Sequence, residues 1–147
     1  MLGKIKKFDE VLYDKYDTPA RELLKIKLGD KIKDNPDIYA EDMIIDDENC
    51  IYKFLEIQVC AEWIGEKYPH EKPFVFERKG HFNDKTLFIL FDKHMTKAYL
   101  FAKTSLEENP VRTKKYSRYF KYQVPWSKVT TVHMENFCMD DIYLFQL

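Results

Sequence analysis

The chain has 147 residues, a net charge of −1 at pH 7, and an aromatic content of 16%. This length matches one domain, and 45% hydrophobic residues can form a core, so the composition excludes an intrinsically disordered chain. The balanced charge excludes a partner that is recognised by net charge alone, so any nucleic-acid surface must be local.

Nothing in the sequence is typical of export, of a membrane or of zinc binding. The apolar runs are shorter than the ~20 residues that a membrane span needs. The first residues have no apolar stretch of signal-peptide length, so we expect an intracellular, non-secreted protein with no membrane partner. Cys50, Cys60 and Cys138 have spacings unlike those of zinc motifs and are interpreted as reduced thiols.

The chain begins with helical signals. Residues 1–16 are charged with a few apolar anchors, which indicates a short helix. Residues 17–19 (Asp-Thr-Pro) are typical of a helix start, and an apolar face over residues 19–33 predicts an amphipathic helix. Residues 35–37 (Asn-Pro-Asp) end this helix.

Strand signals follow the helix. Residues 38–46 and 50–60 are apolar runs around a polar turn, which predicts a hairpin. Further expected elements are a helical turn at 61–68, strands at 74–79, 86–92, 97–103, 119–124 and 128–133, a polar linker at 105–117, and a tail at 135–147 that docks on the core. The expected fold class is α+β (mixed α/β), with a leading helix followed by a mixed sheet.

Two acids stand in the first two expected strands. Asp42 directly precedes an apolar run, and Glu56 lies in the next strand on the same face as Gln58. Carboxylates on adjacent strands can hold Mg²⁺, which can activate a water for attack on a phosphodiester. Tyr52 and Phe54 share the Glu56 face, and an acid among aromatic residues requires a partner or a metal.

The order of helix, acid-bearing strand and Glu-x-Gln strand resembles the core of the PD-(D/E)xK nuclease superfamily, which includes restriction enzymes and archaeal Holliday-junction resolvases. The resemblance covers residues 18–60 and implies a restriction-endonuclease-like core. It assigns Glu22 as the helix acid, Asp42 as the strand Asp and Glu56 as the next acid. Asp37 is an alternative to Asp42, which we favour because it directly precedes the apolar residues of its strand.

Gln58 stands where the family has its lysine. Glutamine cannot supply a charge, although some restriction enzymes are similar to this chain in having Gln there. A lysine from elsewhere in the chain can take this role. Lys53 is three residues before Glu56, so its side chain leaves the opposite face of the strand. The sequence does not show where Lys79 or Lys85 lies relative to this strand.

The resemblance also implies roles for these residues. Asp42 and Glu56 would bind Mg²⁺ or Mn²⁺, helped by the backbone carbonyl of Ile57. Glu22 would act through a bound water or a second metal, and Gln58 would hydrogen-bond the attacking water or the scissile phosphate. Family members often form dimers, so the resemblance implies a homodimer.

A basic and aromatic stretch lies between Glu108 and Glu135, a window without acids. Cations can contact phosphates and aromatic rings can stack on bases, which makes DNA the expected partner. The candidate nucleic-acid-binding residues are Arg112, Lys114, Lys115, Arg118, Tyr119 and Lys121. The alternative interpretation is a basic edge strand whose aromatic residues belong to the core.

We therefore expect a single domain over residues 1–147, made of an N-terminal extension (1–17), a nuclease-like core (18–104) and a basic, aromatic C-terminal part (105–147). The expected function is metal-dependent hydrolysis of DNA phosphodiester bonds by an endonuclease. Because the family lysine is absent, two alternatives remain. The first is a catalytically inactive nuclease-like module that binds nucleic acid. The second is a structural or interaction protein in an assembly.

Overall fold

The computed structural model describes residues 13–113 and 119–146, and its centre is a mixed six-stranded sheet. In spatial order its strands are β1 (Ile32–Asp34), β2 (Met43–Ile45), β3 (Phe54–Val59), β5 (Thr86–Phe91), β6 (Lys97–Ala102) and β9 (Thr130–His133). A second sheet contains β4 (Phe74–Phe76), β8 (Phe120–Gln123) and β7 (Val111–Arg112), in that order. The class is therefore mixed α/β, as the sequence predicts.

The helices are few and short. A π-helical turn at Tyr13–Asp17 leads into α2 (Thr18–Leu28), and α3 (Met139–Phe145) lies near the end of the chain. Single 3₁₀ turns cover Gly29–Lys31, Glu77–Lys79, Lys103–Ser105 and Trp126–Lys128. Within the described part of the chain, no helix combines the length and the apolar character that crossing a membrane would need.

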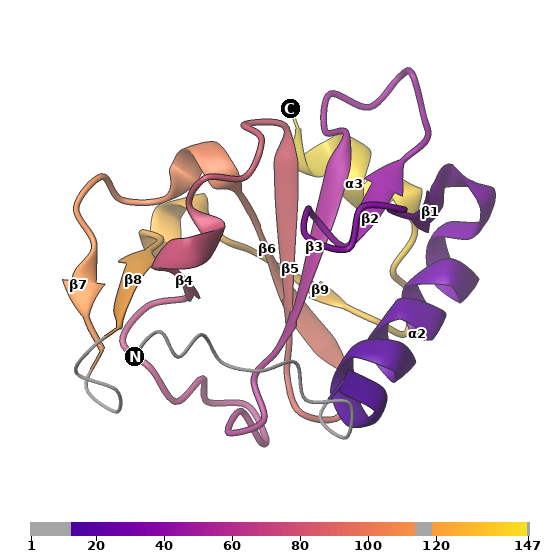
Figure 1. Cartoon of the computed structure of the whole chain (residues 1–147). Helices are drawn as coiled ribbons and strands as arrows, with labels where there is room; N and C mark the ends of the chain where they lie inside the picture. The colour runs from indigo at the N-terminus through magenta and orange to yellow at the C-terminus, as the bar shows by residue number, and fades with distance from the viewer. Residues whose placement is uncertain (1–12, 114–118, 147) are drawn as a thin grey trace.

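The strands of the main sheet run in both directions. β1, β2 and β3 form an antiparallel meander, and β5 then pairs with β3 in parallel. β6 and β9 follow as antiparallel neighbours. A parallel neighbour requires a crossover connection, and here the connection between β3 and β5 contains β4 (Figure 1).

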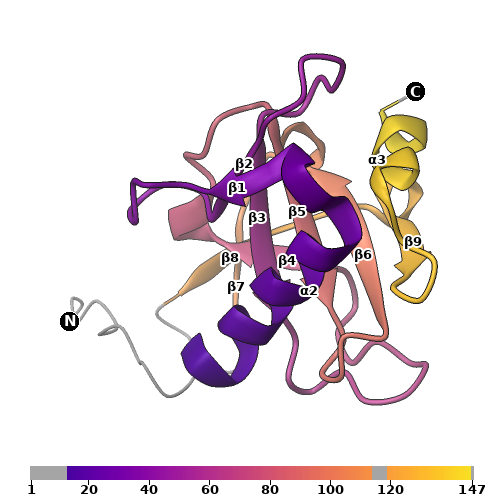
Figure 2. The ribbon, with the colours of Figure 1, turned by 90° about the vertical axis from the view of Figure 1, so that its right-hand side faces the viewer.

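Two apolar cores pack against the two faces of the main sheet. α2 and α3 cover one face, where Leu24 and Ile142 are fully buried. The small sheet covers the other face, where Trp63 and Val75 are fully buried (Figures 1 and 2). β3 lies between the two cores, and its successive side chains point to opposite faces. Leu55 and Glu56 are therefore both buried, one on each face of the sheet.

The hairpin predicted from residues 38–46 and 50–60 is confirmed, and the strands predicted at 86–92 and 97–103 pair with each other. The docking of the C-terminal tail is also confirmed, since Ile142 lies in the first core. The prediction of a helix over residues 19–33 is wrong at its end. The helix stops at Leu28 because Gly29 takes a φ of 63°, and Ile32 enters the same core from a strand.

Other elements also differ from those expected. The strand predicted from residue 38 begins at Met43, because residues 35–41 form a loop held by its own hydrogen bonds. The strand predicted over 74–79 ends at Phe76 and continues as a 3₁₀ turn. Residues 61–68 form bends and turns without a helix. Of the helix expected within residues 1–16, residues 1–12 lie outside the described part.

Candidate functional site

The pairing of β2 with β3 brings Asp42 beside Glu56. Met43 pairs with Leu55, so the next positions outward place Asp42 opposite Glu56 on one face of the sheet. One hydrogen bond joins the two acids, and a second joins Asp42 to the residue after Glu56. The Asp42 N–H donates to Glu56 Oε1 at 2.9 Å, and the Ile57 N–H donates to Asp42 Oδ2 at 2.8 Å. The two acids therefore lie side by side, at the start of one strand and in the middle of the next.

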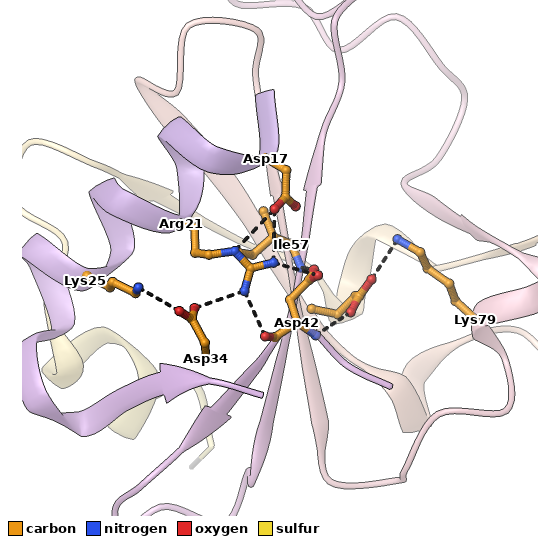
Figure 3. Close-up of polar contacts among 8 residues, drawn as sticks. Asp17, Arg21, Lys25, Asp34, Asp42, Ile57 and Lys79 are labelled. Carbon is orange, nitrogen blue, oxygen red and sulfur yellow. Dashed lines mark hydrogen bonds and ion pairs between the residues drawn. The ribbon is translucent and has the colours of Figure 1, made fainter. Parts of the chain in front are cut away.

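A lysine reaches this pair from a distant part of the sequence. Lys79 Nζ lies 2.9 Å from Glu56 Oε2, the contact drawn as the dashed line from Lys79 in Figure 3. The Glu56 side chain is only 7% exposed. Lys79 reaches this position because β4 ends at Phe76 and the turn Glu77–Lys79 bends towards β3. The sequence showed the lysine but gave no signal of where this strand would end.

The carboxyl group of Asp42 sits in an environment that disfavours its charge. Burial and the neighbouring Glu56 carboxylate raise the pKa of Asp42 to about 6. The Ile57 N–H, Lys79 and Arg21 oppose this rise because each favours the ionised form. A carboxyl group with such a raised pKa beside a second acid is a frequent property of functional sites.

Arg21 of α2 holds Asp42 from the other side. Its guanidinium contacts Asp42 Oδ1 at 3.1 Å and the Asp42 backbone oxygen at 2.9 Å (Figure 3). The same group pairs with Asp17 at 3.0 Å and with Asp34 at 3.1 Å. A hydrogen bond from Lys25, together with Arg21, lowers the pKa of Asp34. Arg21 thus fixes the residue that precedes β2 to the helix.

The structure does not bring Glu22 to the two acids. Glu22 is exposed on α2, and in the described residues no hydrogen bond or ion pair involves it. The residue of α2 that contacts Asp42 is Arg21. The acid that joins Arg21 from the start of this helix is Asp17. Asp37 lies in the loop before β2, where its Oδ1 accepts a hydrogen bond from the Tyr39 N–H.

Gln58 lies two residues beyond Glu56 in β3, so its side chain leaves the same face of the sheet. Its Nε2 atom is buried and has no hydrogen-bond partner among the described residues. A buried donor without a partner carries a desolvation cost, so this atom lowers the stability of the fold as it stands.

The basic stretch contributes to the small sheet. The Arg112 guanidinium lies 4.8 Å from the Phe120 ring centre, and Lys121 Nζ lies 4.4 Å from that of Phe74. Tyr119 is 43% exposed. The remaining three candidates lie outside the described residues: Lys114, Lys115 and Arg118.

The acid pair offers few direct metal ligands. Within residues 13–113 and 119–146, no group of three or more His, Cys, Asp or Glu side chains is arranged to hold a metal ion. Two carboxylates fit Mg²⁺, which commonly binds one or two carboxylates and takes its other ligands from water and phosphate. Comparisons with family models, with curated proteins and with solved structures find no match to this chain.

Proposed function

We propose that this protein hydrolyses phosphodiester bonds of DNA in a reaction that depends on Mg²⁺ or Mn²⁺. The observation that carries the proposal is the cluster of Asp42, Glu56 and Lys79. The Asp42 N–H donates to Glu56 at 2.9 Å, and Lys79 Nζ lies 2.9 Å from the other carboxylate oxygen of Glu56. An acid pair with a lysine is the residue set that the PD-(D/E)xK resemblance calls for, and here Lys79 takes the role that Gln58 cannot fill.

The topology supports the same proposal. A helix leads into the antiparallel strands β1, β2 and β3, and β5 adds in parallel to β3. Asp42 immediately precedes β2, and Glu56 lies in the middle of β3. These are the places where the resemblance implies acids, so we propose a restriction-endonuclease-like core.

The chemistry of the two acids fits a hard divalent cation. Asp42 and Glu56 would hold the ion through carboxylate oxygens, the donors that Mg²⁺ and Mn²⁺ prefer. When bound, such an ion lowers the pKa of a coordinated water and neutralises charge on the phosphate. Protonation of Asp42 would weaken binding, so a pKa of about 6 places the competent ionised form at neutral pH.

Side chains near the two acids supply the remaining contacts with the attacking water and the phosphate. Lys79 balances the charge of buried Glu56, and its ammonium can donate to the attacking water or to a phosphate oxygen. The unpartnered Nε2 of Gln58 can donate to the same phosphate. Arg21 keeps the Asp42 carboxylate oriented and so acts as a positioning residue.

Nicking of supercoiled plasmid tests this function. Wild-type protein should nick DNA with Mg²⁺ or Mn²⁺ and stop in EDTA, and Glu56→Gln should lower the rate at least about 100-fold, as loss of a group that stabilises the transition state does. Glu22→Gln is the control, because Glu22 is exposed and away from the acid pair. Wild-type protein without metal-dependent nicking, or Glu56→Gln with full activity, would overturn the proposal.

One observation favours a second candidate, a nuclease-like module without catalysis. All four carboxylate oxygens of Asp42 and Glu56 already accept a hydrogen bond or ion pair from the protein. Such a set can serve as a buried structural network. In that case, DNA binding persists in EDTA, no metal-dependent nicking occurs, and Glu56→Gln lowers only the free energy of unfolding.

A further inference from the structure

The small sheet has an inner and an outer face. Val75 of β4 is fully buried in the second core, and Tyr122 of β8, its register partner, packs against that core. The residues on either side of Val75 therefore point the other way. Phe74 and Phe76, with Lys121 opposite Phe76, form an outer face on the side away from the main sheet.

Aromatic rings and cations alternate on this outer face. The Phe74 and Phe76 ring centres are 5.7 Å apart, with the ring planes at 81°. Lys121 Nζ lies 4.4 Å from the Phe74 ring centre, and the Arg78 guanidinium lies 5.5 Å from that of Phe76. Both rings are only partly buried, so part of their surface faces solvent.

Such a surface suits unpaired nucleotides. Bases stack on aromatic side chains without regard to sequence, while Lys and Arg neutralise the phosphates. The bases of a duplex are already stacked on one another, so their faces cannot reach a protein ring. The chemistry therefore favours a single strand over a duplex.

The turn that follows β4 connects the outer face with the acid pair along the chain. β4 leads directly into the turn Glu77–Lys79, in which Arg78 contacts Phe76 and Lys79 contacts Glu56. Two adjacent residues thus contact the aromatic surface and the candidate centre.

We propose that the outer face of the small sheet binds single-stranded nucleic acid. Its bases stack on Phe74 and Phe76, and Arg78 and Lys121 contact its phosphates. This inference rests on the proposed function for the kind of ligand, and it deepens that function by making an unpaired strand the preferred substrate.

Fluorescence anisotropy tests the proposal in EDTA, where cleavage does not occur. The probes are a labelled dT oligonucleotide and a labelled duplex of equal length. Wild-type protein should bind the single strand more tightly, and the double variant Phe74→Leu/Phe76→Leu should weaken this binding by roughly 5- to 150-fold, as loss of a stacked base does. Phe145→Leu is the matched control, because this half-buried ring packs on Tyr52 in the other core.

The salt dependence tests the cations separately. The logarithm of the association constant for the single strand falls with the logarithm of the salt concentration. Arg78→Gln should make this slope shallower by about 0.7, whereas Lys33→Gln should not change it. Lys33 is an exposed lysine on β1 and pairs with Asp46. Thermal unfolding of each variant shows whether it is folded.

Three outcomes would overturn this inference: equal binding of the strand by wild type and the folded double variant, tighter binding of the duplex, or no binding of either probe. The result also separates this inference from the proposed function. If wild type binds the strand through Phe74 and Phe76 but shows no metal-dependent nicking, only the proposed function fails. If it nicks duplex DNA with no role for these rings, only this inference fails.

Discussion

The backbone N–H of Asp42 donates a hydrogen bond to the side chain of Glu56 at 2.9 Å. The Asp42 carboxylate in turn accepts a hydrogen bond from Ile57, the residue after Glu56. Each acid thus holds the strand that carries the other. This reciprocal contact places two carboxylates at one point of the sheet, where Lys79 and Arg21 reach them from outside the hairpin.

The raised pKa of Asp42 predicts a pH-dependent stability. Because the folded-state pKa of about 6 exceeds the ordinary value of 3.8, the folded protein binds this proton more tightly than the unfolded chain. This proton's contribution to the free energy of unfolding is complete below pH 4 and is lost as the pH rises through 6, a change of about 3 kcal/mol. Urea unfolding between pH 4 and pH 7.5 should show this loss in wild type but not in Asp42→Asn. Identical pH profiles for the two proteins would contradict the assignment.

The ion pair of Lys79 with Glu56 should be strongly coupled. Lys79→Met leaves a buried carboxylate without a cation and should lower the free energy of unfolding by about 3–5 kcal/mol. Adding Glu56→Gln removes the stranded charge, so the double variant should recover part of that loss. Lys103→Met is the control, because its partner Asp84 is exposed and such pairs contribute about 1 kcal/mol or less. If Lys79→Met and Glu56→Gln lower the free energy of unfolding additively, the two residues are not coupled as an ion pair.

Only part of this site could be predicted from the sequence. Strand alternation and the short polar turn suffice to predict a hairpin whose two apolar runs carry Asp42 and Glu56, but they do not show that the two acids share a face. The lysine could not be found in this way, because its position depends on where β4 ends and on the turn that follows. Both are set by packing against β8, a strand more than 40 residues away in the sequence.

The helix residue that contacts Asp42 is a second part of the site that could not be predicted from the sequence. The apolar spacing of α2 shows which face enters the core, but it does not show which flank of that face lies over β2. Arg21 occupies that flank and Glu22 does not. Likewise, the burial of Glu56 follows from the small sheet, whose strands come from distant parts of the chain.

Gly80 should be required for the placement of Lys79. A Cβ atom at residue 80 would lie 2.6 Å from the Tyr122 ring, closer than atoms normally approach. Gly80→Ala should therefore push the turn away from β8 and lower the free energy of unfolding by about 1–3 kcal/mol. Chemical denaturation measures this cost, which should shrink when Tyr122→Ala makes room. An equal cost in both backgrounds would show that the Tyr122 ring is not the cause.

Gln58 offers a variant in which stability and activity should change in opposite directions. Its Nε2 atom is buried without a partner among the described residues, so Gln58→Met should raise the free energy of unfolding by about 1 kcal/mol. If the amide donates to a phosphate, the same change should lower the rate of plasmid nicking. A variant that is more stable and fully active would remove Gln58 from the proposed centre.

The central claim is that Asp42 and Glu56 share a divalent cation, and calorimetric titration with Mn²⁺ tests it most directly. At pH 7.5 we predict saturable Mn²⁺ binding to wild type and to Glu22→Gln, with binding lost in Glu56→Gln. Absence of saturable binding to wild type, or equal affinity in Glu56→Gln, would contradict the account.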